Sequence, residues 1–176
     1  MTTTISDTGS NVARVNKVRA GSLPLRRPVK SILGRSGHIR KPLSLAEWNV
    51  RTLLDTEGSR RPERQTALVA KELNRYDIDI AVLCETRLPG YDSFVDNGYT
   101  FFWSGKTEQE RRESGVGIAI RNSIVQNLDQ DPTPINDRIM TMRMPLDKKC
   151  FLTIVSVYAP TLTNTDENKE RFYNNL

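Results

Sequence analysis

A strand, a helix and a second strand follow one another over residues 43–84, and this succession constrains the fold more than any other feature. Residues 43–50 alternate loosely between apolar and polar side chains, as a strand with one buried face does. Residues 63–76 carry an apolar stripe at helical spacing, and Pro62 before them suits a first helical turn. Residues 78–84 are almost wholly apolar, which is typical of a strand buried on both faces. A strand–helix–strand unit this short predicts two parallel strands.

The second half of the chain predicts antiparallel strands instead. Four segments have strand character and lie close together along the chain: 99–103, 116–120, 138–144 and 151–158. Their short spacings favour hairpins, one of them with a turn over 145–149. The last residues, from Asn164 to Leu176, open like a capped helix with Thr165 as the N-cap. We therefore expect an α/β (α+β) chain built on one mixed sheet with flanking helices, whose opposite apolar face is left bare.

Charge divides the chain into two unequal parts. Residues 1–42 hold nine Lys or Arg against a single acid, Asp7, and so carry +8; because the whole chain carries +5, residues 43–176 carry −3. The first part is rich in Ser, Thr, Gly, Pro and Arg without a helical or strand period, which predicts a disordered tail before a domain at 43–176. A basic tail suits contact with phosphate backbones, or nuclear import through residues 25–30, although a solvated leader has the same composition.

Composition excludes several protein classes. The longest apolar run is about six residues, far below the ~20 that cross a bilayer, so we expect no membrane span. Residues 1–7 are polar with no apolar block behind them, which predicts no secretory signal. Only Cys84 and Cys150 are present, too few for a disulfide scaffold. These features predict an intracellular protein, and the basic tail favours the nucleus.

Three polar residues come where predicted strands end: Asn49, Glu85 and Tyr158. In an open α/β sheet, side chains at the carboxyl ends of strands converge where ligands bind. A carboxylate directly after a buried strand costs desolvation energy unless it is paired or binds a cation, so Glu85 is the strongest candidate for a functional group. An ion pair with Arg87 or Arg51 would also explain Glu85. Asn49 would equally serve as a strand-end cap, and Tyr158 as a packing residue.

Four short segments occur in a specific order: Trp48-Asn-Val-Arg-Thr-Leu53, Leu83-Cys-Glu-Thr-Arg-Leu88, Gly115-Val-Gly-Ile-Ala-Ile120 and Val157-Tyr-Ala-Pro160. This succession resembles the N-terminal half of the endonuclease/exonuclease/phosphatase superfamily, over residues 43–176. It is similar in particular to the endonuclease domains of non-LTR retrotransposons and to sequences like craniofacial development protein 2. The resemblance implies half of a four-layer α/β sandwich and a phosphodiesterase, and favours a DNA endonuclease of retroelement type.

The resemblance also implies roles for individual residues. Asn49 would lie beside the scissile phosphate and help to hold the attacking group, Glu85 would bind catalytic Mg2+ or Mn2+, and Tyr158 would contact the phosphate. Mg2+ prefers hard oxygen ligands and keeps several waters, so one or two carboxylates suffice. Repair-type members carry an acid at the position of Arg51, where an arginine would repel a cation and touch phosphate instead. The resemblance gives Arg138 a structural or phosphate-facing role.

Two further parts of the family's machinery, a Gly-Asp-x-Asn segment and a late Ser-Asp-His segment, do not occur before Leu176. The only histidine, His38, lies in the basic tail. Loss of several catalytic groups, each contributing about 10²- to 10⁴-fold, predicts an inactive fragment that lacks the C-terminal half of its domain. The expected partner is the backbone of DNA or RNA. Two alternatives stay open: a non-catalytic remnant or nucleic-acid-binding protein, and a phosphatase acting on small phosphate esters.

Other features have plain structural explanations. Gly115 and Gly117 lack the third glycine of a dinucleotide-binding loop, so close backbone packing explains them better. The methionines of 138–144 alternate on one strand face, as core residues do. Cys84 has no basic partner that would activate it, which predicts a buried thiol. The charges of 106–114 nearly cancel, as in a solvated loop.

Overall fold

A computed structural model describes residues 3–6, 12–18, 42–55, 64–147 and 150–176 of the chain. Within them, seven strands form one mixed sheet in the order β1-β2-β3-β4-β7-β6-β5, and three form a second sheet in the order β10-β9-β8. The first sheet holds β1 (Thr3–Ser6), β2 (Val12–Val18), β3 (Leu43–Asn49), β4 (Ile80–Cys84), β5 (Tyr91–Asp96), β6 (Tyr99–Ser104) and β7 (Val116–Arg121). The second holds β8 (Thr133–Asn136), β9 (Ile139–Asp147) and β10 (Cys150–Val157), and the helices are α1 (Gln65–Arg75), α2 (Asn122–Val125) and α3 (Asp166–Asn175).

The predicted parallel unit is confirmed. β3 and β4 pair in parallel, with Asn49 opposite Cys84 at their carboxyl ends, and α1 connects them. The ladder continues one step further, because the Val50 amide donates to the Cys84 carbonyl at 3.0 Å. Pro62 lies outside the described residues. Both strands therefore deliver their next residues to the same edge of the sheet.

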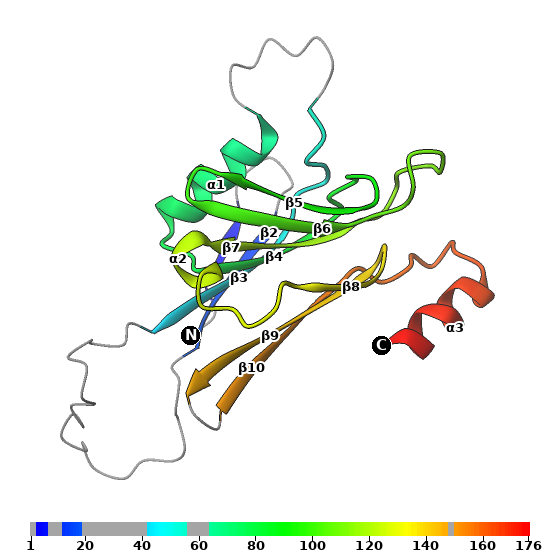
Figure 1. The fold of residues 1–176 in the computed structure, drawn as a ribbon. Helices are drawn as coiled ribbons and strands as arrows, with labels where there is room; N and C mark the ends of the chain where they lie inside the picture. The colour runs from blue at the N-terminus through cyan, green and yellow to red at the C-terminus, as the bar shows by residue number, and fades with distance from the viewer. Residues whose placement is uncertain (1–2, 7–11, 19–41, 56–63, 148–149) are drawn as a thin grey trace, which may run out of the picture.

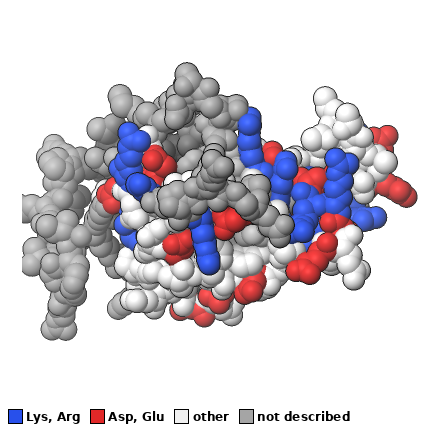
Figure 2. Space-filling model, turned by 90° about the horizontal axis from the view of Figure 1, so that it is seen from above, with Lys and Arg blue, Asp and Glu red and all other residues white. Residues whose placement is uncertain are grey.

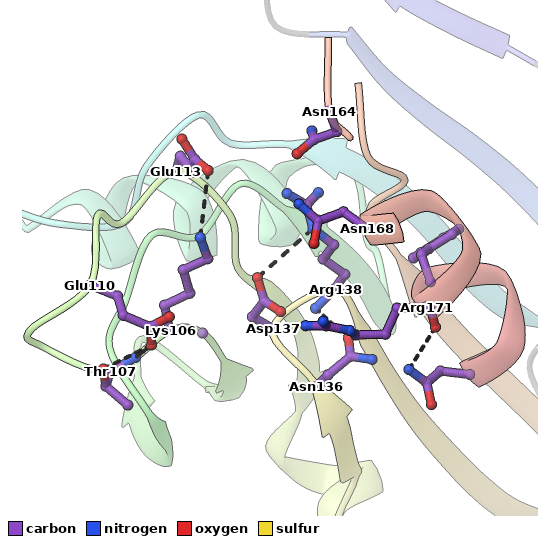
Figure 3. A pocket seen from close by; sticks show the side chains of 13 residues that line it. Lys106, Thr107, Glu110, Glu113, Asn136, Asp137, Arg138, Asn164, Asn168 and Arg171 are labelled. Atoms are coloured by element: carbon purple, nitrogen blue, oxygen red, sulfur yellow. Dashed lines mark hydrogen bonds and ion pairs between the residues drawn. The ribbon is translucent and has the colours of Figure 1, made fainter. Parts of the chain in front are cut away.

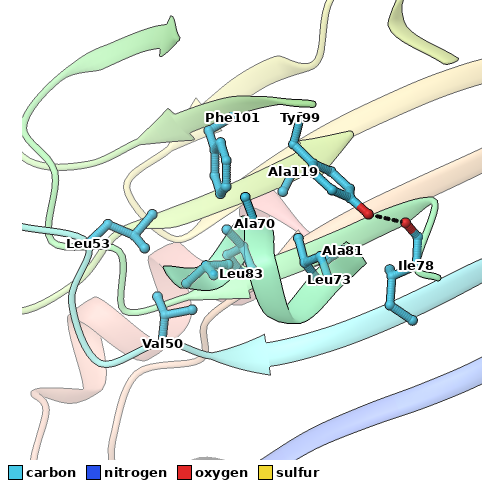
Figure 4. Close-up of a cluster of buried hydrophobic side chains, with 11 residues drawn as sticks. Val50, Leu53, Ala70, Leu73, Ile78, Ala81, Leu83, Tyr99, Phe101 and Ala119 are labelled. Carbon is cyan, nitrogen blue, oxygen red and sulfur yellow. Dashed lines mark hydrogen bonds between the residues drawn. The ribbon is translucent and has the colours of Figure 1, made fainter. Parts of the chain in front are cut away.

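α1 covers one face of the first sheet, as Figures 1 and 4 show. Its residues Val69, Ala70 and Leu73 are buried against side chains from three central strands: Ala81, Leu83, Tyr99, Phe101 and Ala119. Small alanines on β4 and β7 let the helix approach the sheet closely. The buried Tyr99 hydroxyl donates to the Ile78 carbonyl, which satisfies a polar group that burial would otherwise penalise.

The second sheet covers the other face of the first. Alternate residues of β4 and β7, Ile80, Val116, Ile118 and Ile120, point away from α1 and pack with Phe102 against the β9 methionines Met140, Met142 and Met144. The mixed α/β class is thus confirmed, and so is the prediction that the methionines fill a core. The expectation of a single sheet with a bare opposite face was wrong, because the 138–158 hairpin turns under the sheet instead of extending it.

Several elements escaped prediction. β1 and β2 lie within the segment expected to be a tail without strands, and β2 pairs antiparallel with the edge of β3, so for these two strands the expectation was wrong. Their pairing uses main-chain groups of an open sheet edge, for which no side-chain period is required. The strands β5 and β8 and the single turn of α2 were also not predicted. The domain boundary at residue 42 stays a prediction.

The C-terminal helix α3 begins as predicted. Thr165 is its N-cap, with a side-chain oxygen that accepts from the Asn168 amide at 3.4 Å, and Asp166 and Glu167 stand in the first turn. Phe172 is its one buried residue. In the described part of the chain, no helix is long and apolar enough to span a bilayer.

Packing between the two sheets can be tested at Met140, whose side chain is fully buried. We predict that Met140→Ala lowers the free energy of unfolding by ~2 to 5 kcal/mol, because it opens a cavity between the sheets. Val155→Ala is the control, since Val155 lies on β10 of the same sheet with 43% of its surface exposed; it should change stability by less than about 1 kcal/mol. Urea unfolding followed by tryptophan fluorescence measures both, and equal losses would contradict the sandwich.

Candidate active site

The side chains of Asn49 and Glu85 meet at the shared carboxyl edge of β3 and β4. Asn49 is the last residue of β3, and Glu85 directly follows β4. The Asn49 Nδ2 donates to Glu85 Oε1 at 2.6 Å. Asn49 Oδ1 accepts from the Arg51 amide at 3.0 Å. Both ends of the Asn49 amide are therefore engaged, which fixes its orientation and presents its N–H to the carboxylate.

Glu85 also contacts a cation of the chain. Its Oε2 lies 3.5 Å from Arg87 Nη2, and only 18% of the Glu85 side chain is exposed. An ion pair with Arg87 was one of the alternatives that the sequence left open, and it coexists with the asparagine contact. The Glu85 carboxylate is therefore held in one position, because the Asn49 amide donates to one oxygen and the Arg87 guanidinium lies beside the other.

The backbone around this pair adopts an uncommon conformation. Arg51, Glu85 and Arg87 all have left-handed φ values, of 61°, 58° and 57°. Residues other than glycine reach this region at a cost of about 1 to 3 kcal/mol each, and such residues concentrate at functional sites. The chain leaves both strands through strained turns that place these side chains together.

Thr86 anchors the turn between Glu85 and Arg87. Its side chain is fully buried, its amide donates to the Gly115 carbonyl at 3.1 Å, and its carbonyl accepts from the Leu53 amide at 2.8 Å. A Cβ on Gly115 would collide with the Thr86 hydroxyl, and one on Gly117 would come within 3.2 Å of the Thr86 methyl. The two glycines thus make room for Thr86, which confirms that close packing explains them.

The second sheet brings Tyr158 to the same edge. The Cys84 thiol donates to the Val157 carbonyl and the Ser156 hydroxyl donates to the Leu83 carbonyl, both at 3.4 Å. These contacts join the ends of β4 and β10, so Tyr158, which follows β10, reaches Glu85. Cys84 is buried as predicted, and burial, together with Glu47 and Glu85, raises the pKa of its thiol to about 11. It is a packing group and not a nucleophile.

Tyr158 faces the Glu85 carboxylate. Partial burial, the negative charge of Glu85 and a hydrogen bond to that carboxylate raise the pKa of the Tyr158 hydroxyl, while Arg138 and Arg87 act in the opposite direction. The hydroxyl therefore stays protonated at neutral pH and can donate its single proton, to Glu85 or to another acceptor in its place. Asn49, Glu85 and Tyr158, which lie far apart in the sequence, form one cluster.

Arg138 supports Tyr158 from behind. Its guanidinium lies 5.2 Å from the centre of the Tyr158 ring and donates to the Tyr158 carbonyl at 3.2 Å and to the Ala159 carbonyl at 3.4 Å. A further contact of 3.9 Å joins Arg138 Nε to Asp137 Oδ2. With only 15% of its side chain exposed, Arg138 is used mainly to shape the site. The phosphate contacts expected for Arg138 and Arg51 stay predictions.

Sequence reasoning missed parts of this arrangement. It considered Arg87 only as an ion-pair partner, and it gave no role to Thr86 or to Asp137, which accepts from the Ser114 hydroxyl. Thr86 is a short side chain directly after a buried strand, which permits its burial, but the sequence does not indicate that it anchors the turn. Nothing in the sequence indicates the pairing of Ser114 with Asp137.

The cluster provides few ligands for a cation. Among the described residues, no group of three or more His, Cys, Asp and Glu side chains lies close enough together to hold a metal ion. The carboxylate of the Asn49–Glu85–Tyr158 cluster is that of Glu85, with the Asn49 amide beside it. This set suits a hard, well-hydrated ion such as Mg2+, which takes one or two carboxylates and keeps its remaining waters. It does not suit Zn2+, which needs three or four nitrogen, sulfur or carboxylate ligands.

The Thr86 anchor can be tested through Gly115, whose φ is +130° and whose Cβ would also lie 2.8 Å from the Arg87 amide nitrogen. We predict that Gly115→Ala lowers the free energy of unfolding by about 3 kcal/mol or more, since strain and collision add. Gly98→Ala is the matched control, because Gly98 has a φ of +88° but open space around it; it should cost only about 1 to 2 kcal/mol. Urea denaturation separates the two. A Gly115 variant as stable as the Gly98 variant would show that the turn is not tightly packed.

Known proteins resemble this chain in sequence. Residues 46–176 match the Endonuclease/Exonuclease/phosphatase family. Craniofacial development protein 2 of Tragulus javanicus is 26% identical over 175 residues, which cover 98% of this chain and 28% of that protein. Craniofacial development protein 2 of Bos taurus is 28% identical over 132 residues, or 75% of this chain and 20% of that protein. The chain therefore spans less than a third of the length of these relatives. Because the family match covers most of the chain, the protein belongs to the Endonuclease/Exonuclease/phosphatase family.

Proposed function

We propose that this chain forms the metal-binding part of a phosphodiesterase that hydrolyses nucleic acid, of the retroelement endonuclease type. The observation that carries the proposal is the 2.6 Å hydrogen bond between Asn49 and Glu85 at the carboxyl edge of two parallel strands. Open α/β sheets bind ligands at this edge. Family membership supports the reaction class, since the family takes its name from phosphate-ester hydrolases.

Each residue of the cluster has a distinct proposed role. Glu85 holds a hydrated Mg2+, with Mn2+ as a substitute, and this ion would supply positive charge to the phosphoryl oxygens. The Asn49 amide orients the carboxylate and offers an N–H beside the scissile phosphate. The Tyr158 hydroxyl, protonated at neutral pH, donates to a phosphate oxygen. Arg87 balances the charge of Glu85 before an ion binds, at 3.5 Å from it.

The metal role is tested by binding rather than turnover. We predict that the chain binds Mn2+ in competition with Mg2+, and that Glu85→Gln weakens the Mn2+ affinity by at least about tenfold because it removes the single carboxylate ligand. Glu113→Gln is the control, since Glu113 is a half-exposed carboxylate engaged by Lys106 at 3.5 Å. Electron paramagnetic resonance of free Mn2+ gives the affinity, and circular dichroism verifies folding. Equal affinities of the two variants would remove Glu85 from the metal site.

We further propose that the 176-residue chain alone is inactive. Among the described residues, no group of three or more His, Cys, Asp and Glu side chains lies together, and the only histidine of the sequence, His38, lies outside them. A water molecule at the site would therefore lack a general base, which is worth about 10²- to 10⁴-fold in rate.

Nicking of supercoiled plasmid tests this proposal. With Mg2+ present, the chain should nick no faster than buffer, and Glu85→Ala should behave identically. Nicking that disappears in Glu85→Ala would contradict the inactivity and support the metal role. Nicking that survives Glu85→Ala would contradict both.

A further inference from the structure

A polar pocket lies next to the Tyr158 end of the candidate site. It has a volume of 480 Å³ and is bounded by the loop from Gly105 to Glu113, by the turn from Asn136 to Arg138, and by α3 (Figure 3). Pockets of this size hold small ligands or a single unit of a polymer. Four of its side chains are asparagine amides, and three are Lys106, Arg138 and Arg171.

The acidic side chains of the pocket are already engaged by other groups of the chain. Glu113 pairs with Lys106 at 3.5 Å, and Glu110 accepts from the Thr107 amide and hydroxyl at 3.2 and 2.8 Å. The two hydrogen bonds from Thr107 lower the pKa of Glu110, so it stays ionised. Asp137 accepts from the Ser114 hydroxyl and lies beside Arg138. The acceptors that line the pocket are thus largely satisfied from within.

The donors are not satisfied to the same degree. The guanidinium of Arg171 has no hydrogen-bond or ion-pair partner among the described residues, although Figure 3 shows it beside Asn136 and Arg138. The side-chain amides of Asn136 and Asn168 make no donation to any described residue; Asn136 uses only its oxygen, which accepts from the Arg138 amide at 2.8 Å. Open donors with occupied acceptors favour a ligand rich in oxygen lone pairs.

The charge of the lining limits which oxygen-rich ligand fits. Lys106, Arg138 and Arg171 oppose Glu110, Glu113 and Asp137, so the lining is close to neutral. In such a pocket a phosphomonoester dianion would keep one negative charge that Arg171 does not match, whereas a phosphodiester carries a single charge that one arginine balances. Figure 2 agrees with this mixture, since basic and acidic side chains intermingle towards the end that carries α3.

Contacts connect the pocket to the candidate site. Arg138 lines the pocket and packs on the ring of Tyr158, which faces Glu85 at the candidate site. The pocket and the candidate site therefore adjoin through the contact between Arg138 and Tyr158. We propose that this pocket binds the phosphodiester of a nucleotide adjacent to the one at Glu85, with Arg171 as the main contact and Asn136 and Asn168 as hydrogen-bond donors. The inference rests on the proposed function, which puts a phosphate at Glu85, and it adds that the substrate is a nucleic-acid strand and not a small phosphate ester.

Oligonucleotide binding tests the pocket separately from the metal site. The full chain is titrated in EDTA against a labelled 12-nucleotide single-stranded DNA, and fluorescence anisotropy is recorded at several KCl concentrations. Arg171→Gln should weaken binding by about tenfold and reduce the slope of log affinity against log salt by about one. Arg171→Lys should keep most of the slope, because it keeps the charge. Arg75→Gln, at an arginine on α1 with 68% of its side chain exposed, is the matched control and should change little.

Two further probes make the result specific. A methylphosphonate strand of the same sequence has no backbone charge, so it should bind wild type and Arg171→Gln equally weakly. Vesicles of phosphatidylserine present the competing source of phosphodiester groups and should not distinguish Arg171→Gln from Arg75→Gln.

The outcomes decide the pocket and the metal site independently. Equal effects of Arg171→Gln and Arg75→Gln on DNA binding, no DNA binding by wild type at low salt, or an effect of Arg171→Gln on vesicles alone would overturn the pocket proposal. If the Glu85 variants lose Mn2+ while Arg171→Gln binds DNA normally, the pocket fails and the metal role stands. If Arg171→Gln weakens DNA binding while Mn2+ binding is absent, the pocket stands and the metal role fails.

Discussion

The contact between Asn49 and Glu85 depends on the parallel pairing of β3 and β4. Antiparallel strands would send their next residues to opposite edges of the sheet, and the two side chains would not meet. Parallel pairing in turn needs a crossover, which α1 provides while it covers one face of the sheet. The same helix that completes a core thus also sets the geometry of the site.

The second sheet has a similar double use. Its methionines fill the face opposite α1, and its last strand ends beside the end of β4, held there by the Cys84 and Ser156 hydrogen bonds. Tyr158 therefore arrives at Glu85 through the packing of two sheets and not through local sequence. The surrounding core, in which Thr86 is fully buried, holds the turns at Arg51, Glu85 and Arg87 in their strained conformations.

Local patterns predicted the parts of the fold that depend on local chemistry. The sequence alone indicates three of these elements: α1 by its apolar stripe, β4 by its apolar run, and the start of α3 by the capping residue Thr165. The second sheet could not be predicted in this way, because a hairpin has the same alternation whether it extends a sheet or packs beneath one. β1 and β2 depend on a distant edge, and the short α2 depends on its neighbours.

The candidate site shows the same division. Asn49, Glu85 and Tyr158 could be singled out because each follows a strand in a recognisable motif. The partners that orient them, such as the Arg51 amide, the Arg138 guanidinium and the Thr86 anchor, come from backbone conformation and from contacts between sheets. The pocket beside α3 is lined by three segments that are separate in the sequence, so no single motif predicts it.

The two cysteines differ in a way that is useful in the laboratory. Cys84 is buried with a thiol pKa raised to about 11, whereas Cys150 is exposed at the start of β10. Thiolate is the reactive form, so a maleimide dye or a spin probe added near neutral pH attaches at Cys150 and spares Cys84. Cys150 is therefore a single labelling site on the second sheet, and distance measurements from it need no engineered cysteine.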